Sequence, residues 1–121
     1  MIADNLKTES WVRVACVAEI PEGNCTCTAF EGTSIAVFNA GGVFYAIGDS
    51  CTHAAASLSE GDFYEDIRGW VVECPRHGSQ FDVTTGEAIS LPATGNSGAY
   101  ETKVEEGVVY INLEPMTPRQ E

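Results

Sequence analysis

The sequence predicts an all-β fold, either an antiparallel β-sandwich or a small barrel. Segments rich in β-branched and aromatic residues are short and separated by turn-forming residues. The 12 glycines are spread along the whole chain, as frequent tight turns require. No segment of about 11 or more residues shows the 3.6-residue apolar period of an amphipathic helix.

The predicted strands follow one another along most of the chain. The first ends at a turn made by residues 21–24, and the segments 39–42 and 105–107 contain glycines that favour hairpins. Residues 114–121 carry two prolines and are expected to fray. In order, the predicted strands are Trp11–Ile20, Thr33–Phe38, Val43–Ile47, Trp70–Glu73, Ser79–Val83, Tyr100–Val104 and Val108–Leu113.

Length and charge narrow the function classes. The 121 residues fit one domain, 1–121, large enough for a single hydrophobic core. Six basic and 18 acidic residues give a net charge of −12. Nucleic acids and anionic membranes need a basic face, so neither is expected as a partner. A protein with a basic docking surface would be attracted instead.

The cysteines and the N-terminus favour a cytoplasmic protein. Five cysteines cannot all pair within one chain. Residues 1–10 are polar, with no apolar stretch typical of a signal peptide. In a reducing cytoplasm, cysteines more often bind metal or stay free than form disulfides.

The two histidines form the chemical signature of the sequence, because each lies beside a cysteine. The two half-motifs are Cys51-Thr52-His53 and Cys74-Pro75-Arg76-His77. Each lies between predicted strands, so two hairpin tips would bring two thiols and two imidazoles together. Tetrahedral zinc accepts the same donors, although zinc fingers usually group their cysteines. One cysteine and one histidine per loop suits a two-iron cluster, with thiolates on one iron and imidazoles on the other. A zinc-stabilised interaction module remains the alternative.

The half-motifs, together with Gly78-Ser79 and the following Phe81-Asp82-Val83-Thr84-Thr85-Gly86, resemble the Rieske iron–sulfur family. The resemblance implies one Rieske-type [2Fe–2S] cluster, with Cys51 and Cys74 on one iron and His53 and His77 on the other. It also implies a cluster-binding subdomain of two hairpin loops over about residues 48–94. The interval between the half-motifs is longer than is usual in the family. The extra residues are expected within 62–69, as a longer hairpin or loop.

The same resemblance implies a low reduction potential. High-potential family members join their two cluster loops by a disulfide, and the matching positions here are Ala56 and Arg76. They also place a serine and a tyrosine hydroxyl near the cluster, where this chain has Ser79 and Phe81. Hydrogen bonds to cluster sulfur raise the potential, so the missing hydroxyl at Phe81 lowers it. Pro92 matches a proline-containing loop that covers the cluster, or it is an ordinary turn proline.

Within the family, the chain resembles the soluble ferredoxins of bacterial aromatic ring-hydroxylating dioxygenases. This implies that it carries single electrons from an NAD(P)H-dependent flavoprotein reductase to a terminal oxygenase. Turnover by the chain alone is not expected, because the mononuclear iron of an oxygenase needs two further histidines. We expect a monomer. The small subunit of another cytoplasmic reductase, such as a nitrite reductase, is the second interpretation.

Four carboxylates lie within seven residues after the first half-motif. They belong to Glu60, Asp62, Glu65 and Asp66. They are either an ordinary solvated segment or a docking site for a basic partner surface.

Three cysteines lie outside the half-motifs. Cys25 and Cys27 alternate as residues of a strand do, and with Cys16 they are interpreted as small buried residues.

Overall fold

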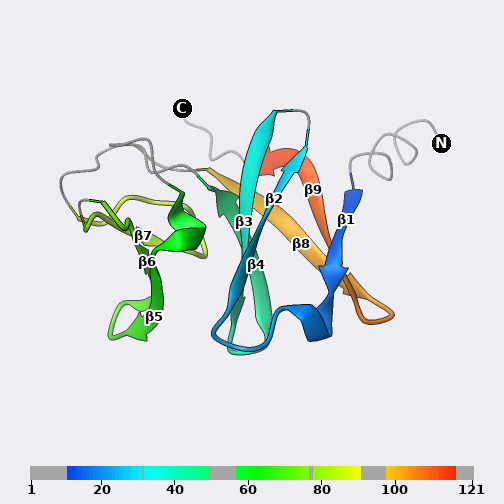
Figure 1. Cartoon of the computed structure of the whole chain (residues 1–121), viewed down its shortest axis with the longest axis horizontal. Coiled ribbons are helices and arrows are strands. Elements are labelled where there is room, and N and C mark those ends of the chain that lie inside the picture. The colour runs from blue at the N-terminus through cyan, green and yellow to red at the C-terminus, as the bar shows by residue number, and fades with distance from the viewer. Residues whose placement is uncertain (1–10, 31, 50–56, 77, 91–97, 117–121) are drawn as a thin grey trace.

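The computed structural model describes residues 11–30, 32–49, 57–76, 78–90 and 98–116, which form two antiparallel sheets and no α-helix. The strands are β1 (Trp11–Cys16), β2 (Cys25–Phe30), β3 (Thr33–Ala40), β4 (Val43–Gly48), β5 (Asp62–Asp66), β6 (Gly69–Glu73), β7 (Gln80–Asp82), β8 (Ala99–Glu105) and β9 (Val108–Met116). The larger sheet has the order β1-β9-β8-β4-β3-β2, and β5, β6 and β7 form the smaller sheet beside it (Figure 1). Two 3₁₀ turns, η1 (Val17–Glu19) and η2 (Leu58–Glu60), complete the described elements. The fold prediction is confirmed.

Strand β3 separates two hydrophobic cores. Its residues 35–40 are all buried, because neighbouring side chains of a strand point to opposite faces. Ile35 and Val37 pack into one core with residues of β4 and β9. Ala36 and Phe38 pack into the other core, which includes residues of the small sheet. The second core therefore joins the two sheets.

The two predicted hairpins of the large sheet are confirmed. Gly41 and Gly42 connect β3 to β4, and both have a positive φ, 66° and 102°. Glu106 and Gly107 connect β8 to β9 in the same way, with φ of 51° and 77°. Two-residue turns with two positive φ angles match the right-handed twist of the flanking strands.

The small sheet packs its apolar face on the second core. Phe63, Val72 and Phe81 are aligned across β5, β6 and β7. The ring of Phe63 lies 4.8 Å from that of Phe38 and 5.1 Å from that of Trp70, between centroids. Residues 62–69 belong to the β5–β6 hairpin, and the placement of the extra residues there stays a prediction.

Three features of the fold differ from the sequence prediction. The first strand ends at Cys16, where the chain enters η1 and the backbone N–H of Cys16 donates to the Glu19 carboxylate at 3.1 Å. Strand β2 is not among the predicted strands. Strand β9 continues to Met116, paired with Ala99, so the ordered strand reaches into the tail expected to fray. Residues 117–121 lie outside the described residues. No helix in the described ranges is long and apolar enough to cross a membrane.

Candidate metal centre

The second half-motif lies on the hairpin between β6 and β7. Cys74 directly follows β6 and is 2% exposed, within the core that joins the sheets. Its N–H donates to the carbonyl of Ser79 at 2.7 Å, and its own carbonyl accepts the N–H of Gly78 at 3.1 Å. Gly78 has a φ of +75°, which favours glycine. The hairpin therefore buries the Cys74 thiol at its base while the turn faces solvent at Arg76.

The other three proposed ligands lie outside the described residues. These are Cys51, His53 and His77; the same holds for Ala56 and Pro92. The gathering of the four ligands therefore stays a prediction. In the part of the chain that is described, no three His, Cys, Asp or Glu side chains form a metal site.

The ends of the segment that carries Cys51 and His53 are joined through Asp49. The carbonyl of Asp49 accepts the N–H of Leu58 at 2.7 Å, and its carboxylate accepts the N–H of Ser59 at 2.8 Å. The Asp49 side chain is almost fully buried, at 2% exposure. Buried carboxylates need such partners because desolvation is costly. Asp49 thus binds Leu58 and Ser59, and these contacts connect the two sides of the sequence segment that contains the first half-motif.

The cysteines of β2 complete this arrangement. The Cys27 thiol donates to the Asp49 carboxylate at 3.1 Å, and the Cys25 thiol donates to the carbonyl of Ser59 at 3.4 Å. Partial burial and then the hydrogen bond to Asp49 raise the pKa of Cys27 to about 11. Burial and the Asp49 charge also raise the pKa of Cys25.

The interpretation of the extra cysteines as buried is wrong for Cys27, which is exposed; Cys16 and Cys25 are half-buried. All three are free thiols. Alternation along β2 correctly places Cys25 and Cys27 on one face, but β2 is an edge strand in the sheet order. That face is only partly covered.

Two of the residues expected around the cluster, Ser79 and Phe81, are buried near Cys74. Ser79 and Phe81 are both fully buried. Phe81 belongs to the same core as Cys74 and carries no hydroxyl. Arg76 is exposed and lies in the turn itself. The low-potential expectation stays a prediction.

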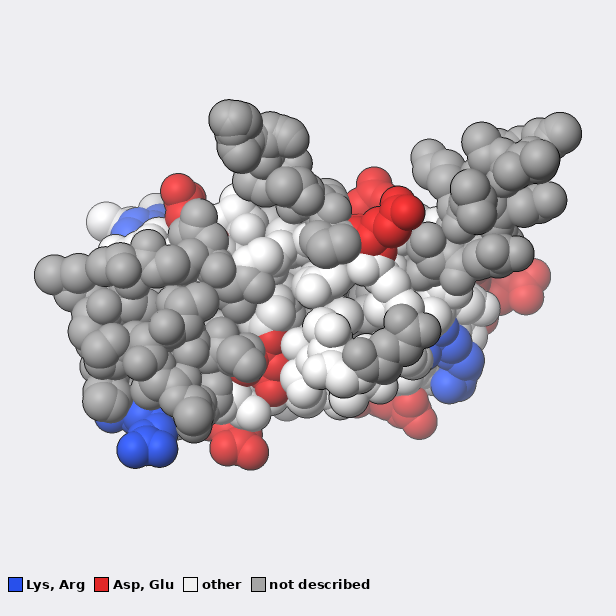
Figure 2. Space-filling model, turned by 90° about the horizontal axis from the view of Figure 1, so that it is seen from above, with Lys and Arg blue, Asp and Glu red and all other residues white. Residues whose placement is uncertain are grey.

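The four carboxylates of residues 60–66 separate into two groups. Glu60 and Asp62 line a depression of about 300 Å³ together with Glu73, Cys74 and Gly78. Glu65 and Asp66 lie at the far end of β5, where hydrogen bonds from Arg68 lower the pKa of Asp66. In Figure 2 the acidic side chains are spread over several separate places on one face of the protein. Of the two groups, only the first therefore lies beside Cys74, the one proposed ligand that the structure describes.

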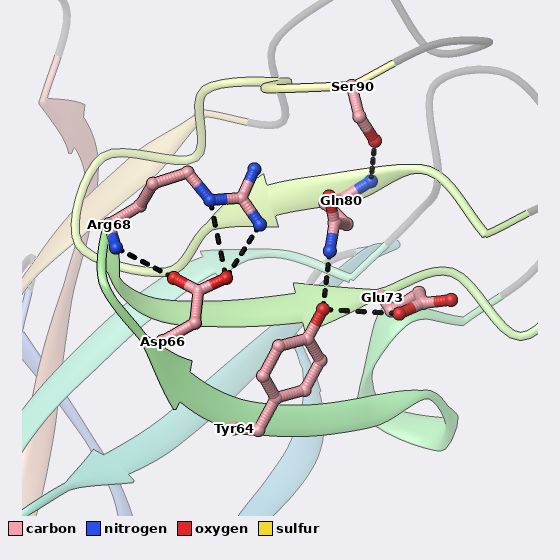
Figure 3. A network of polar contacts seen from close by, with 6 residues as sticks. All are labelled: Tyr64, Asp66, Arg68, Glu73, Gln80 and Ser90. Atoms are coloured by element: carbon pink, nitrogen blue, oxygen red, sulfur yellow. Dashed lines mark hydrogen bonds and ion pairs between the residues drawn. The ribbon is translucent and has the colours of Figure 1, made fainter.

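A polar network on the outer face of the small sheet was not predicted from the sequence. Tyr64 donates its hydroxyl to the Glu73 carboxylate at 3.2 Å and accepts a hydrogen bond from Gln80 (Figure 3). The backbone N–H of Gln80 donates to Ser90 Oγ at 2.8 Å. The sequence signals this face only weakly, because residues 62–66 show no strict alternation of polar and apolar residues.

One glycine shows how closely the elements around Cys74 approach. A Cβ on Gly61 would lie 1.8 Å from the carbonyl oxygen of Glu73. The end of η2 therefore packs directly on the residue before Cys74. The sequence carries no sign of this contact, because many glycines lie in turns.

Comparison with known proteins identifies the family. Residues 10–107 match the family model of the Rieske [2Fe-2S] domain, so the chain belongs to this family. Its cofactor is accordingly a Rieske-type [2Fe–2S] cluster. The buried thiol of Cys74 at the base of a hairpin fits such a group, because thiolates are ligands of iron–sulfur clusters.

Curated relatives are ferredoxin components of dioxygenase systems. The ferredoxin component of the naphthalene 1,2-dioxygenase/salicylate 5-hydroxylase systems of Ralstonia sp. is 38% identical, over 88% of this chain and 99% of its own length. The 3-phenylpropionate/cinnamic acid dioxygenase ferredoxin subunit of Escherichia coli K12 is 44% identical, over 84% of this chain and 92% of its own length. The similarity thus extends along nearly the whole of both relatives.

Solved structures agree with this assignment. A chain in the complex of reduced oxygenase and oxidised ferredoxin of carbazole 1,9a-dioxygenase matches with a TM-score of 0.82 and 38% identity, covering 89% of this chain and 97% of that one. The carbazole 1,9a-dioxygenase ferredoxin of Nocardioides aromaticivorans IC177 matches with a TM-score of 0.79 and 32% identity, covering 85% and 97%. A chain described as an NADH-dependent nitrite reductase small subunit from Mycobacterium tuberculosis reaches 0.76 at 19% identity, covering 84% and 92%, and shows the fold alone.

Proposed function

We propose that this chain is the ferredoxin of an aromatic ring-hydroxylating dioxygenase system, with Cys51, Cys74, His53 and His77 holding its cluster. The proposal rests on how much of each relative's own length the match covers. The chain spans 92–99% of ferredoxin components that are 38–44% identical to it. It therefore matches whole electron carriers rather than one part of a larger enzyme.

The ligand set supports the transfer of single electrons at a reduction potential above that of a cluster with four cysteine ligands. When bound, a Rieske cluster accepts and releases one electron. Two neutral histidines replace two thiolates, so the cluster is less negative and easier to reduce than a four-cysteine cluster. The chain's own residues hold Cys74 away from solvent, through the core around Phe81 and the hydrogen bonds to Ser79 and Gly78. We place the potential at the low end of the Rieske range because Phe81 lacks a hydroxyl.

The partners follow from the charge and from the relatives. The chain takes electrons from an NAD(P)H-dependent flavoprotein reductase and passes them to a terminal oxygenase, as a cytoplasmic monomer without turnover of its own. The docking surface is centred on Glu60 and Asp62, because they line the depression beside Cys74. Complementary charge speeds the encounter of such partners.

Rapid-mixing experiments test this function. The reduced chain is mixed with the oxidised terminal oxygenase of the E. coli 3-phenylpropionate system, and the spectra of both Rieske centres are followed. Stoichiometric reoxidation of the chain is expected, with a rate that falls as salt rises. The variant E60Q/D62N should weaken that salt dependence, and E65Q/D66N is the matched control with the same loss of charge.

Two results would oppose the proposal. A chain that is reduced by dithionite but transfers no electron to this oxygenase or to that of the naphthalene system would contradict the ferredoxin function. Equal salt dependence in the two double variants would contradict the docking surface at Glu60 and Asp62.

A further inference from the structure

The Glu73 carboxylate is held at the base of the second ligand hairpin. Glu73 is aligned with Gln80 across β6 and β7, and Tyr64 reaches it from β5. All three side chains point to the outer face of the small sheet, opposite Phe63 and Val72 (Figure 3). Glu73 immediately precedes the proposed ligand Cys74.

The direction of each hydrogen bond in this network is determined. The amide nitrogen of Gln80 can only donate, so the Tyr64 oxygen accepts there. The Tyr64 proton is then directed to Oε1 of Glu73, which accepts at 3.2 Å. The two bonds therefore fix Tyr64 and keep it as a donor to the carboxylate.

The second oxygen of Glu73 faces the hairpin itself. A Cβ built on Gly78 would lie 3.4 Å from Oε2 of Glu73. The carboxylate also lines the depression next to Cys74. Within the described ranges, neither lysine nor arginine forms an ion pair with Glu73. A carboxylate with no cationic partner among the described residues thus lies against Gly78, in the hairpin that follows Cys74.

We propose that the Glu73 carboxylate, held by Tyr64, lowers the reduction potential of the cluster. This inference rests on the proposed ligand set. Reduction adds one negative charge, and a fixed carboxylate nearby raises the energy of the reduced state. At about 10 Å, a unit charge changes a one-electron equilibrium about twofold at the dielectric constant of water and more than tenfold at an effective value of about 20.

The substitution E73Q removes the negative charge of this side chain and keeps nearly the same side-chain size. A glutamine oxygen still accepts the hydroxyl hydrogen bond of Tyr64, so the network is kept while the charge is lost. E65Q is the matched control, because it removes one carboxylate from the same sheet. Glu65 lies opposite Trp70, three residue positions from the Asp62–Glu73 pair, which is about 10 Å along the strands.

The midpoint potentials of the purified, iron-loaded variants are measured by EPR-monitored titration, with iron and sulfide assayed in each sample. E73Q should shift the reduction equilibrium toward the reduced state by about threefold or more, which is about 28 mV for one electron. E65Q removes a charge farther from Cys74 and should shift it clearly less than E73Q. Y64F removes the hydrogen bond that holds the Glu73 carboxylate. This variant should also shift the reduction equilibrium toward the reduced state, by less than E73Q. In the double variant Y64F/E73Q, the Y64F change should add nothing.

Three other results would overturn this inference, part of it, or the ligand set on which it rests. Loaded E73Q protein with an unchanged potential, or with the same shift as E65Q, overturns this inference and leaves the proposed function intact. Additive effects of Y64F and E73Q overturn the role of Tyr64. Wild-type protein without iron and sulfide overturns the ligand set and this inference together.

Discussion

The substitution Asp49→Ala should loosen the segment that carries the first half-motif. Asp49 stands two residues before Cys51, and its carboxylate is 2% exposed. It accepts the N–H of Ser59 at 2.8 Å and the thiol of Cys27 at 3.1 Å. Alanine removes both bonds and leaves the Ser59 N–H without this acceptor. The backbone bond from Leu58 to the Asp49 carbonyl remains.

The size of the effect follows from these two bonds. A hydrogen bond to a charged acceptor contributes about 2 kcal/mol, and the weaker thiol donor about 1 kcal/mol. Their loss totals about 3 kcal/mol. Because each 1.36 kcal/mol is a factor of about ten, the segment should open about 150-fold more often.

Bleaching of the cluster's visible absorbance in excess iron chelator measures this opening. When opening and closing are fast, the bleaching rate follows the open population. D49A should bleach on the order of a hundredfold faster than wild type. D49N, which keeps an acceptor for Ser59, should be intermediate. D66A is the control, because within the described ranges the hydrogen bonds to Asp66 come from Arg68 in the β5–β6 turn, and its rate should be that of wild type. A D49A rate equal to that of D66A would refute the role of Asp49.

Three further results are expected. Ser79→Ala should lower the midpoint potential, because it removes a buried hydroxyl beside Cys74, and a potentiometric titration showing no change would contradict this. Between pH 9 and about 11 the folded state keeps the Cys27 proton that the unfolded chain releases, so stability should fall as pH rises through this window. Thermal melting should show a smaller fall for Cys27→Ser than for wild type, and identical pH profiles would contradict the raised pKa. Lys103→Ala should destabilise the protein by about 0.5–1 kcal/mol, since the ammonium lies 4.5 Å from the Trp11 ring centroid and 5.6 Å from that of Tyr110. An unchanged melting temperature would argue against these contacts.

Strong local patterns allowed much of the fold to be predicted. The apolar run 35–38 and the Gly41-Gly42 turn predict the central hairpin because both are local signals. Strand β2 carries a weaker pattern, since Thr26 and Thr28 lie on an edge strand with little burial. The end of β1 at Cys16 depends on the η1 turn, which no apolar period signals.

The sequence allowed the ligands of the candidate site to be predicted, but not the residues that hold the ligand-bearing segments in place. Two Cys–His half-motifs are a specific signal and can be found without a structure. Asp49 and Glu73 are ordinary acidic residues in the sequence. Their importance comes from tertiary contacts with Ser59 and Tyr64, which lie on other elements. The same holds for Gly61, which approaches the Glu73 carbonyl closely where the two ends of the β5–β6 hairpin meet.

Spectroscopy of the anaerobically purified protein shows whether the chain holds a two-iron cluster with both cysteine and histidine ligands. Mössbauer spectra of the reduced, ⁵⁷Fe-enriched chain are recorded together with iron and acid-labile sulfide content. We expect two irons and two sulfides per chain, one iron with sulfur ligands only and the other with nitrogen ligands as well. The variants H53C and H77C should alter the spectrum of the second iron alone. Bound zinc, the absence of labile sulfide, or two equivalent irons would contradict the account.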